Sequence, residues 1–308
     1  MSSIEVDHLS KSFRAGATVL DDVTFKYEGT GAVGYLGPNG AGKTTTLKLL
    51  VGLLLPSGGH ARLNGLEAIH NRKEALWDVG ALIESPEPYP SQSVFDALET
   101  VGRIRGLSSE TIDSEVDRLH EELELPLLER RCGALSKGQR QRVVLGAALI
   151  GDPSVLLLDE PTSGMDPAER VLVRGLLERL KKDHLILMSS HQMVDVSQVC
   201  DELLFLDRGR LLLKDSVQRV AGRIRSRQLD VEFQAPVAEA ALASLGADVG
   251  GVIALNDRRY RLTFDGTDEA RQRILAGCQR LGAVAQFSNA ALVLEEAYLE
   301  VVASSPGK

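Results

Sequence analysis

The sequence has no hydrophobic run long enough to cross a membrane. Its longest apolar stretch, residues 49–55, is interrupted by Gly52, whereas a spanning helix needs about 20 consecutive apolar residues. The first residues also lack the charged segment and apolar run that are typical of a signal peptide. We therefore expect a chain that does not cross a membrane by itself.

Cysteine is scarce, and its spacing excludes two kinds of stabilising site. The three cysteines, Cys132, Cys200 and Cys278, are odd in number and far apart, which argues against a disulfide framework and against a zinc site. A chain of 308 residues can bury a large core without either. We expect inert thiols in a reducing compartment.

A basic excess is also missing. The formal net charge is -8, whereas proteins whose main task is to grip nucleic acid are usually basic. We therefore expect no nucleic-acid partner. The contents of hydrophobic residues (44%) and charged residues (25%) are ordinary for a globular protein, and the length favours roughly two domains.

The first two thirds of the chain contain short apolar segments between helical patterns. Residues 32–36 form an apolar run bounded by glycines, which is typical of a buried strand. Apolar residues recur at threes and fours over 94–135, which predicts a helical subdomain inserted in an α/β domain. Further strands are expected at 4–9, 19–27, 155–158, 185–188, 203–206 and 210–213, and helices at 44–55, 135–150, 168–180 and 192–200.

The pattern changes after about residue 220. The expected elements are a strand, a helix, two strands, a helix and a strand, at 229–233, 237–245, 252–256, 260–264, 269–281 and 283–287, and then a last helix at 293–302. This order predicts a small α+β module of the ferredoxin-like type. We therefore divide the chain into domains at 1–220 and 221–308.

A phosphate-binding loop is the most specific local signal. Residues 37–44 match G-x-x-x-x-G-K-[ST] between a predicted strand and a predicted helix. Glycines allow backbone N–H groups to point at phosphate oxygens, and the helix start adds partial positive charge. Lys43 is placed to reach the β- and γ-phosphates of ATP, and Thr44 to bind Mg²⁺. A plain strand-to-helix turn would not need Lys43-Thr44-Thr45.

Two carboxylates end a second apolar strand. Asp159 and Glu160 follow residues 155–158 directly. Asp159 is placed to hold Mg²⁺ through its water shell, and Glu160 to orient and polarise an attacking water. A surface or helix-capping pair is the alternative. The apolar run before the pair and Pro161-Thr162 after it favour the catalytic interpretation.

With further motifs, the sequence resembles the ATP-binding-cassette (ABC) ATPase family. Residues 135–139 (Leu-Ser-Lys-Gly-Gln) resemble the family signature Leu-Ser-Gly-Gly-Gln, and residues 163–166 resemble the D-loop. His191 follows a strand, as the family's switch histidine does. The resemblance covers about residues 1–220. It implies a P-loop NTPase cassette with a RecA-like core, an antiparallel β subdomain and a helical subdomain at about 90–135.

The resemblance also assigns roles residue by residue. Catalysis falls to Glu160 and His191, and Mg²⁺ to Thr44, Glu84 and, through water, Asp159. The D-loop residues at a dimer interface are Ser163, Gly164 and Asp166. The implied ATP-binding residues are Phe13 and Val19 (at the adenine), Gly37, Pro38, Asn39, Gly40, Ala41, Gly42, Lys43, Thr44, Thr45, Glu84, Asp159, Ser136, Gly138 and Gln139.

Two positions depart from the family pattern. Lys137 replaces a glycine of the signature, and it either faces solvent or adds positive charge near ATP. Glu84 stands where the family has the Q-loop glutamine. A glutamate still binds Mg²⁺ or its water, with one more negative charge. The stretch 83–86 (Ile-Glu-Ser-Pro) is similar to peptide-antibiotic resistance exporters of the family.

The family mechanism implies partners. The signature of one chain would close over ATP held by a second chain, either an identical copy or a related subunit. A separate membrane permease would receive the movement at residues 84–89 and 90–130. The resemblance thus implies a cytoplasmic subunit, peripheral on the inner face of the cell membrane.

Export is the favoured direction of transport. Residues 293–299 match an ending common in drug, lipid and antibiotic export ATPases, and the missing Q-loop glutamine points the same way. An importer ATPase is the alternative. A soluble ABC protein acting on ribosomes or DNA would carry a second cassette or a long insertion, and neither is visible in this sequence. The presence of Lys43, Glu160 and His191 argues against a non-hydrolysing regulator. Residues 221–308 would support dimerisation or regulation, or form a structural cap.

Overall fold

The structure is a computed structural model that describes residues 2–13, 16–84, 86–223, 227–245 and 248–289. It separates into two compact units, Met1–Val217 and Gln218–Lys308. The sequence had placed this division at residue 220. Each unit is described by itself below.

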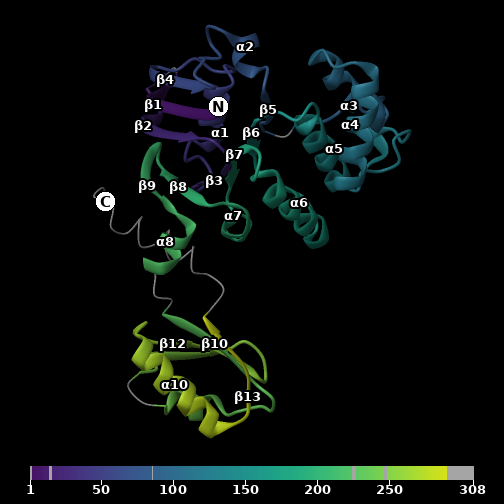
Figure 1. Cartoon of the computed structure of the whole chain (residues 1–308). Coiled ribbons are helices and arrows are strands. Elements are labelled where there is room, and N and C mark those ends of the chain that lie inside the picture. Colours follow the sequence, from purple (N-terminus) through teal and green to yellow (C-terminus); the bar gives the residue numbers. More distant parts are fainter. Residues whose placement is uncertain (1, 14–15, 85, 224–226, 246–247, 290–308) are drawn as a thin grey trace. The chain divides into compact units, whose positions relative to one another are not determined.

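The first unit is built on a six-stranded sheet, parallel except for its last strand (Figure 1). Strands β6 and β7 are buried at every position, as strands covered on both faces are. The strand order is β5 (Val79–Leu82), β6 (Val155–Asp159), β7 (Leu185–Ser190), β3 (Gly31–Leu36), β8 (Glu202–Asp207) and the antiparallel β9 (Arg210–Ser216).

A second, antiparallel sheet shares a core with the first. Its order is β2 (Thr18–Glu28), β1 (Ser3–Ser12) and β4 (Gly58–Leu63). One buried cluster joins Val6 of β1 and Phe25 of β2 to Leu157 of β6. This sheet is the antiparallel subdomain expected from the resemblance, although β4 itself was not recognised in the sequence.

Helix α1 (Lys43–Leu50) leaves the loop that follows β3. It ends before residue 55, where the sequence had placed its end. Gly52 has a φ of 70°, and glycine adopts this left-handed conformation without steric cost at a helix C-terminus. The short helix α2 (Arg72–Leu76) and strand β5 were also missed.

The helical subdomain predicted at about 90–135 contains two of the helices below, and the third follows it (Figure 1). These helices are α3 (Val94–Ile104), α4 (Ser109–Glu122) and α5 (Lys137–Leu149), with a 3₁₀ turn at Cys132–Ala134. Ser93, Ser108 and Ser136 cap their N-termini, which satisfies backbone N–H groups that the helix leaves free. The chain then returns to the sheet at β6. Helix α6 (Pro167–Leu180) connects β6 to β7, and α7 (Met193–Val199) connects β7 to β8. Over the described residues, none of the helices is both long and apolar enough to traverse a bilayer.

The second unit is an antiparallel sheet with helices between its strands (Figure 1). Helix α8 (Val217–Arg223) begins at the boundary. The elements follow as β10 (Gln228–Phe233), α9 (Glu239–Ala243), β11 (Gly251–Ala254), β12 (Arg259–Thr263), α10 (Asp268–Leu281) and β13 (Val284–Asn289). The strand order is β11-β12-β10-β13. The element order is the one predicted, whereas the helix expected at 293–302 lies outside the described residues.

Candidate active site

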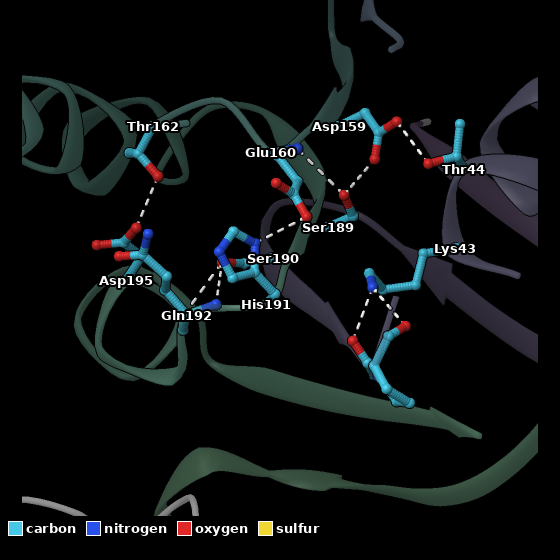
Figure 2. Close-up of polar contacts among 12 residues, drawn as sticks. Lys43, Thr44, Asp159, Glu160, Thr162, Ser189, Ser190, His191, Gln192 and Asp195 are labelled. Atoms are coloured by element: carbon cyan, nitrogen blue, oxygen red, sulfur yellow. Dashed lines mark hydrogen bonds and ion pairs between the residues drawn. The ribbon is translucent and has the colours of Figure 1, made fainter. Parts of the chain in front are cut away.

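The polar residues of the site lie where neighbouring parallel strands end. Residues 37–42 follow β3, Asp159 ends β6, and His191 directly follows β7. Because β3 and β6 both pair with β7 in parallel, these ends meet at one edge of the sheet (Figure 2). Open α/β sheets place their ligands at this edge.

The loop before α1 surrounds the Lys43 ammonium. The Lys43 side chain folds back so that Nζ donates to the carbonyls of Gly37 (2.7 Å) and Pro38 (3.1 Å) (Figure 2). Lys43 is only 6% exposed. Burial lowers the pKa of Lys43, while the carboxylates of Glu160 and Asp159 act in the opposite direction. A cation is thus held at the start of a helix, which favours an anionic ligand.

Asp159 is held by three donors. Its Oδ2 accepts from Thr44 Oγ1 at 2.8 Å and from the backbone N–H of Glu84 at 3.2 Å. Its Oδ1 accepts from Ser189 Oγ, and the register of β6 against β7 places Asp159 opposite Ser189 (Figure 2). A nearly buried carboxylate needs such partners. These contacts also join α1, the segment after β5, and β7 at one point.

Glu160 has an unusual backbone. Its φ is 48°, a left-handed conformation that costs a non-glycine residue about 1–3 kcal/mol. Its N–H donates to both the carbonyl and the hydroxyl of Ser189, each at 3.1 Å. The bend directs the carboxylate to His191, whose Nδ1 lies 2.9 Å from Glu160 Oε1 (Figure 2).

Near Glu160 and His191, Asp195 forms a buried ion pair with Arg174. Asp195 of α7 is fully buried. Its Oδ2 accepts from Thr162 Oγ1 at 2.6 Å, and its Oδ1 from Arg174 Nη1 at 2.7 Å. Asp195 therefore ties the segment after Glu160 to the helix after His191. Sequence analysis missed Asp195 and Ser189. The available signal for Asp195 was an acid between the apolar residues Val194 and Val196.

The backbone and the side chain of Glu84 contact different partners. Its backbone, also left-handed with a φ of 65°, donates to Asp159. Its carboxylate forms an ion pair with Lys48 Nζ. Lys48 lies one helical turn after Thr44 on α1, so α1 contacts Asp159 and Glu84 with neighbouring side chains. The Glu84 side chain is 62% exposed.

Two neighbouring clefts open on these groups, and both are lined by Thr44 and Glu160. The first lies over the loop and is lined by Val19, Asn39, Gly40, Gly42, Lys43, Thr44, Thr45 and Glu160. The second is lined by Thr44, Glu84, Pro86, Glu87, Lys137, Arg140, Gln141, Asp159, Glu160 and Ser163. Phe13, the expected adenine neighbour, is 43% exposed rather than buried in the core, with Lys11 Nζ 4.9 Å from its ring centre.

Two residues of the signature, Ser136 and Gln139, form hydrogen bonds with each other. Ser136 Oγ accepts from the N–H of Gln139 (3.1 Å), and Gln139 Oε1 accepts from the N–H of Ser136 (3.0 Å). This capping box begins α5. Lys137 is exposed, and its side chain runs beside Gly164: a Cβ placed on Gly164 would lie 2.7 Å from Lys137 Cε.

The D-loop ends in a second capping box. Ser163 closes a turn on the carbonyl of Glu160 (3.0 Å). Asp166 caps α6 by accepting from the N–H of Glu169 at 2.9 Å, and Glu169 Oε2 accepts from the N–H of Asp166 at 3.1 Å. The structure therefore groups Lys43, Thr44, Asp159, Glu160 and His191, and places the signature and the D-loop at the starts of two helices.

The chain is similar to proteins of one known family. The family model described as ABC transporter matches residues 20–163. The chain is 32% identical over 304 residues to the uncharacterised ABC transporter ATP-binding protein YxlF of Bacillus subtilis (strain 168), covering 97% of this chain and 99% of that protein. It is 39% identical over 197 residues to Nod factor export ATP-binding protein I of Cupriavidus pinatubonensis, covering 62% and 60%. A solved ATP-binding subunit of an ABC transporter matches with a TM-score of 0.64 and 29% identity, covering 71% of this chain and 92% of that one.

Proposed function

Because this chain belongs to the ATP-hydrolysing subunits of ABC transporters, we propose that it pairs around ATP with a second subunit and drives a separate membrane permease in the direction of export. One observation carries the catalytic part of this proposal. Thr44, Asp159, Ser189, Glu160 and His191 form a continuous set of polar contacts beside the Lys43 loop, in which Ser189 accepts from the backbone N–H of Glu160 (Figure 2).

Residues 37–45 would hold the triphosphate. The N–H groups of the loop and the start of α1 favour anionic oxygens, and Lys43 would exchange its loop carbonyls for the β- and γ-phosphates. Thr44 and Asp159 supply hydroxyl and carboxylate oxygens, which are the ligands that Mg²⁺ prefers. Mg²⁺ held there would neutralise charge that develops on the phosphates. Val19 in the cleft and the exposed Phe13 would contact the adenine.

Glu160 would act as the general base. Its carboxylate projects from the end of β6 with about a third of its side chain exposed, so a water reaches it. A proton from this water passes to Glu160 as the water attacks the γ-phosphate. His191 holds Glu160 through Nδ1 and would present its other ring nitrogen to the γ-phosphate. The Glu84 carboxylate would turn from Lys48 towards the metal or its water.

A second subunit would complete the site. Ser136, Gly138 and Gln139 lie at the start of α5, where an exposed serine hydroxyl and the positive end of the helix suit an anion. We infer that they close over ATP bound by another copy, or by a related chain, and that Ser163, Gly164 and Asp166 of the D-loop line the same interface. ATP would then join the two subunits, and its hydrolysis would release them.

The permease would contact the helical subdomain. Trp77, Tyr89 and Ile104 are exposed apolar side chains at or beside the expected region, and such residues mark docking surfaces when they gather. Trp77 lies next to Gly106, since a Cβ on Gly106 would be 3.7 Å from its ring. Attachment to a permease would place the subunit on the inner face of the cell membrane.

Export is supported by the relatives. Several similar proteins carry the name Nod factor export ATP-binding protein I. An importer ATPase is the alternative. The two are separated by identifying the subunits that co-purify from membranes. A permease alone supports export, whereas a solute-binding protein in the complex supports import. Recovery with ribosomes and without any membrane protein would contradict a transporter.

Glu160→Gln provides the direct test of the ATPase. Glutamine keeps the size of the side chain but cannot take the proton, so hydrolysis should fall about 100-fold or more. ATP should now hold two subunits together, and light scattering after gel filtration would detect the larger species. Glu87→Gln, which removes a carboxylate from the neighbouring cleft, is the matched control. Normal hydrolysis by the Glu160→Gln protein would refute the role of Glu160.

A further inference from the structure

Arg142, a residue of the signature helix without an assigned role, joins three helices. Its Nη1 donates to the carbonyl of Leu123 at 2.9 Å and also to that of Glu124, at the end of α4. Its Nη2 donates to Glu169 Oε1 at 3.2 Å, at the start of α6. The side chains of Arg142 and Glu169 are only 10% and 18% exposed. This ion pair therefore fastens the helical subdomain to the core of the first unit.

Gly138 makes room for the same carboxylate. A Cβ placed on Gly138 would lie 2.1 Å from Oε2 and 2.7 Å from Cδ of Glu169. Separations this short do not occur between non-bonded atoms, so a side chain at position 138 would displace Glu169. The glycine thus allows the first turn of α5 to contact the first turn of α6.

Glu169 also holds the D-loop. Its Oε2 accepts from the N–H of Asp166, which ends the D-loop and caps α6. One carboxylate therefore contacts Gly138 and Arg142 of α5 and Asp166 of the D-loop.

The charges at this junction are favourably placed. Glu169 lies at the positive N-terminal end of α6, and Arg142 donates to the carbonyls at the negative end of α4. Removing one partner of a largely buried pair leaves the other charge uncompensated. The ion pair therefore resists separation of α5 from α6.

From these contacts we propose that Glu169 is a positioning residue, which fixes the signature (135–139) relative to the D-loop (163–166) so that both meet a second subunit together. The inference rests on the proposed function, because it assumes that both segments face that subunit. The side chain of Lys137 beside Gly164 adds a further contact between the two segments. Displacements of about 1 Å in such constellations cost up to about 100-fold in rate.

Kinetics of the full chain test this role. Glu169→Ala should lower kcat about three- to tenfold and change KM for Mg-ATP less than about twofold, because the loop of residues 37–44 is untouched. Glu169→Gln should recover most of kcat, since glutamine also completes a capping box. Glu178→Gln, an exposed position on the same helix, should leave kcat unchanged. A normal kcat for Glu169→Ala would overturn the proposal.

A rescue experiment tests the close contact. Gly138→Ala should reduce kcat about tenfold or more, because its new methyl group strikes the Glu169 carboxylate. Adding Glu169→Ala should restore kcat to the level of Glu169→Ala alone, because that carboxylate is then gone. A double variant as inactive as Gly138→Ala would contradict this, as would a normal Gly138→Ala protein. Binding of a fluorescent ATP analogue and the melting temperature verify that each variant folds.

ATP-dependent pairing separates this inference from the proposed function. In the Glu160→Gln background, ATP should pair the subunits, and Glu169→Ala should weaken that pairing about as much as it lowers kcat. If Glu160→Gln never pairs, the proposed function fails. If it pairs and Glu169→Ala pairs equally well, only the role of Glu169 fails.

Discussion

The six-stranded sheet of the first unit and the sheet of the second unit place their polar residues in opposite ways. In the parallel sheet of the first unit, β3, β6 and β7 end at one edge and bring Lys43, Asp159 and His191 together. In the second unit, every strand runs antiparallel to its neighbours, so successive ends point in opposite directions. Parallel pairing gathers the ends that carry chemistry, whereas antiparallel pairing separates them.

The two units also treat buried charge differently. Asp230 in β10 is 4% exposed and accepts from Arg261 Nε (2.7 Å) and Nη2 (3.0 Å) and from Arg259 Nη2 (3.1 Å). The hydrogen bond from Arg261 leads the causes that lower the pKa of Asp230. Lys43 in the first unit is held only by carbonyls in its hydrogen bonds. A satisfied charge stabilises a fold, while an incompletely neutralised charge is available to a ligand.

The largest effect expected from this contrast is that of Lys43→Met. Removing a charged donor to the phosphates should lower hydrolysis about 100-fold or more. The melting temperature should be retained or raised, because methionine is buried at no electrostatic cost. A lower melting temperature for Lys43→Met would show instead that Lys43 stabilises the fold.

The stability gain of Lys43→Met should depend on pH. Burial lowers the pKa of Lys43 below the unfolded value of 10.5. The protonated lysine is therefore less favourable in the folded chain than in the unfolded chain, and at a pH where it is protonated it lowers the free energy of unfolding. The penalty is full below the folded pKa and disappears as pH rises through 10.5. The difference in melting temperature between variant and parent should shrink over this range, and a difference that is constant with pH would contradict the burial of a charged lysine.

Asp195→Ala tests whether the first unit also contains a charge that is purely structural. It leaves Arg174, with 17% of its side chain exposed, without its carboxylate. Breaking a buried pair in this way costs about 3–5 kcal/mol, which chemical denaturation would measure. Asp195→Glu, which retains the charge, should recover part of the loss. Unchanged stability for Asp195→Ala would mean that the first unit does not depend on this buried charge.

Local patterns in the sequence predicted the parts of the site that are contiguous in the chain. Residues 37–44 and the pair Asp159-Glu160 were found because their neighbours identify them. Three contacts could not be predicted. Ser189 contacts Asp159 because β6 and β7 pair in a particular register. Lys48 of α1 pairs with Glu84 after β5, and Arg142 of α5 pairs with Glu169 of α6. Each depends on residues far apart in sequence.

The same reason explains the elements that were missed. Strand β4 (Gly58–Leu63) begins with two glycines and β5 has only four residues, so neither shows a hydrophobic pattern before its partners are known. Strands β6 and β7 were found because burial on both faces makes them apolar throughout.

Asp230→Asn should have a smaller effect, confined to stability. Hydrogen bonds to charged groups contribute about 1.5–3 kcal/mol, so unfolding of the second unit should become easier by about 1–2 kcal/mol, while ATP hydrolysis stays unchanged. Because the pKa of Asp230 is lowered in the folded chain, its contribution is present above pH 3.8 and is lost as pH falls below it. Glu232→Gln, two positions further along the same strand, is the control. A loss of hydrolysis in Asp230→Asn would show that this unit reaches the catalytic groups.

Glu84→Gln is expected to have the smallest effect. It tests whether an ion pair contributes little energy when it is exposed to solvent. The Glu84 carboxylate is 62% exposed and paired with Lys48, and exposed ion pairs contribute about 0.2–1 kcal/mol. Hydrolysis should therefore change less than about threefold, and so should the concentration of Mg²⁺ that gives half the maximal rate. Lys48→Met should cost about as much, and the double variant no more than either single change, since each removes the same pair. Glutamine still offers an oxygen to the metal or its water, so a change of tenfold or more in the Mg²⁺ requirement of Glu84→Gln alone would mean that the negative charge of Glu84 is itself needed at the metal.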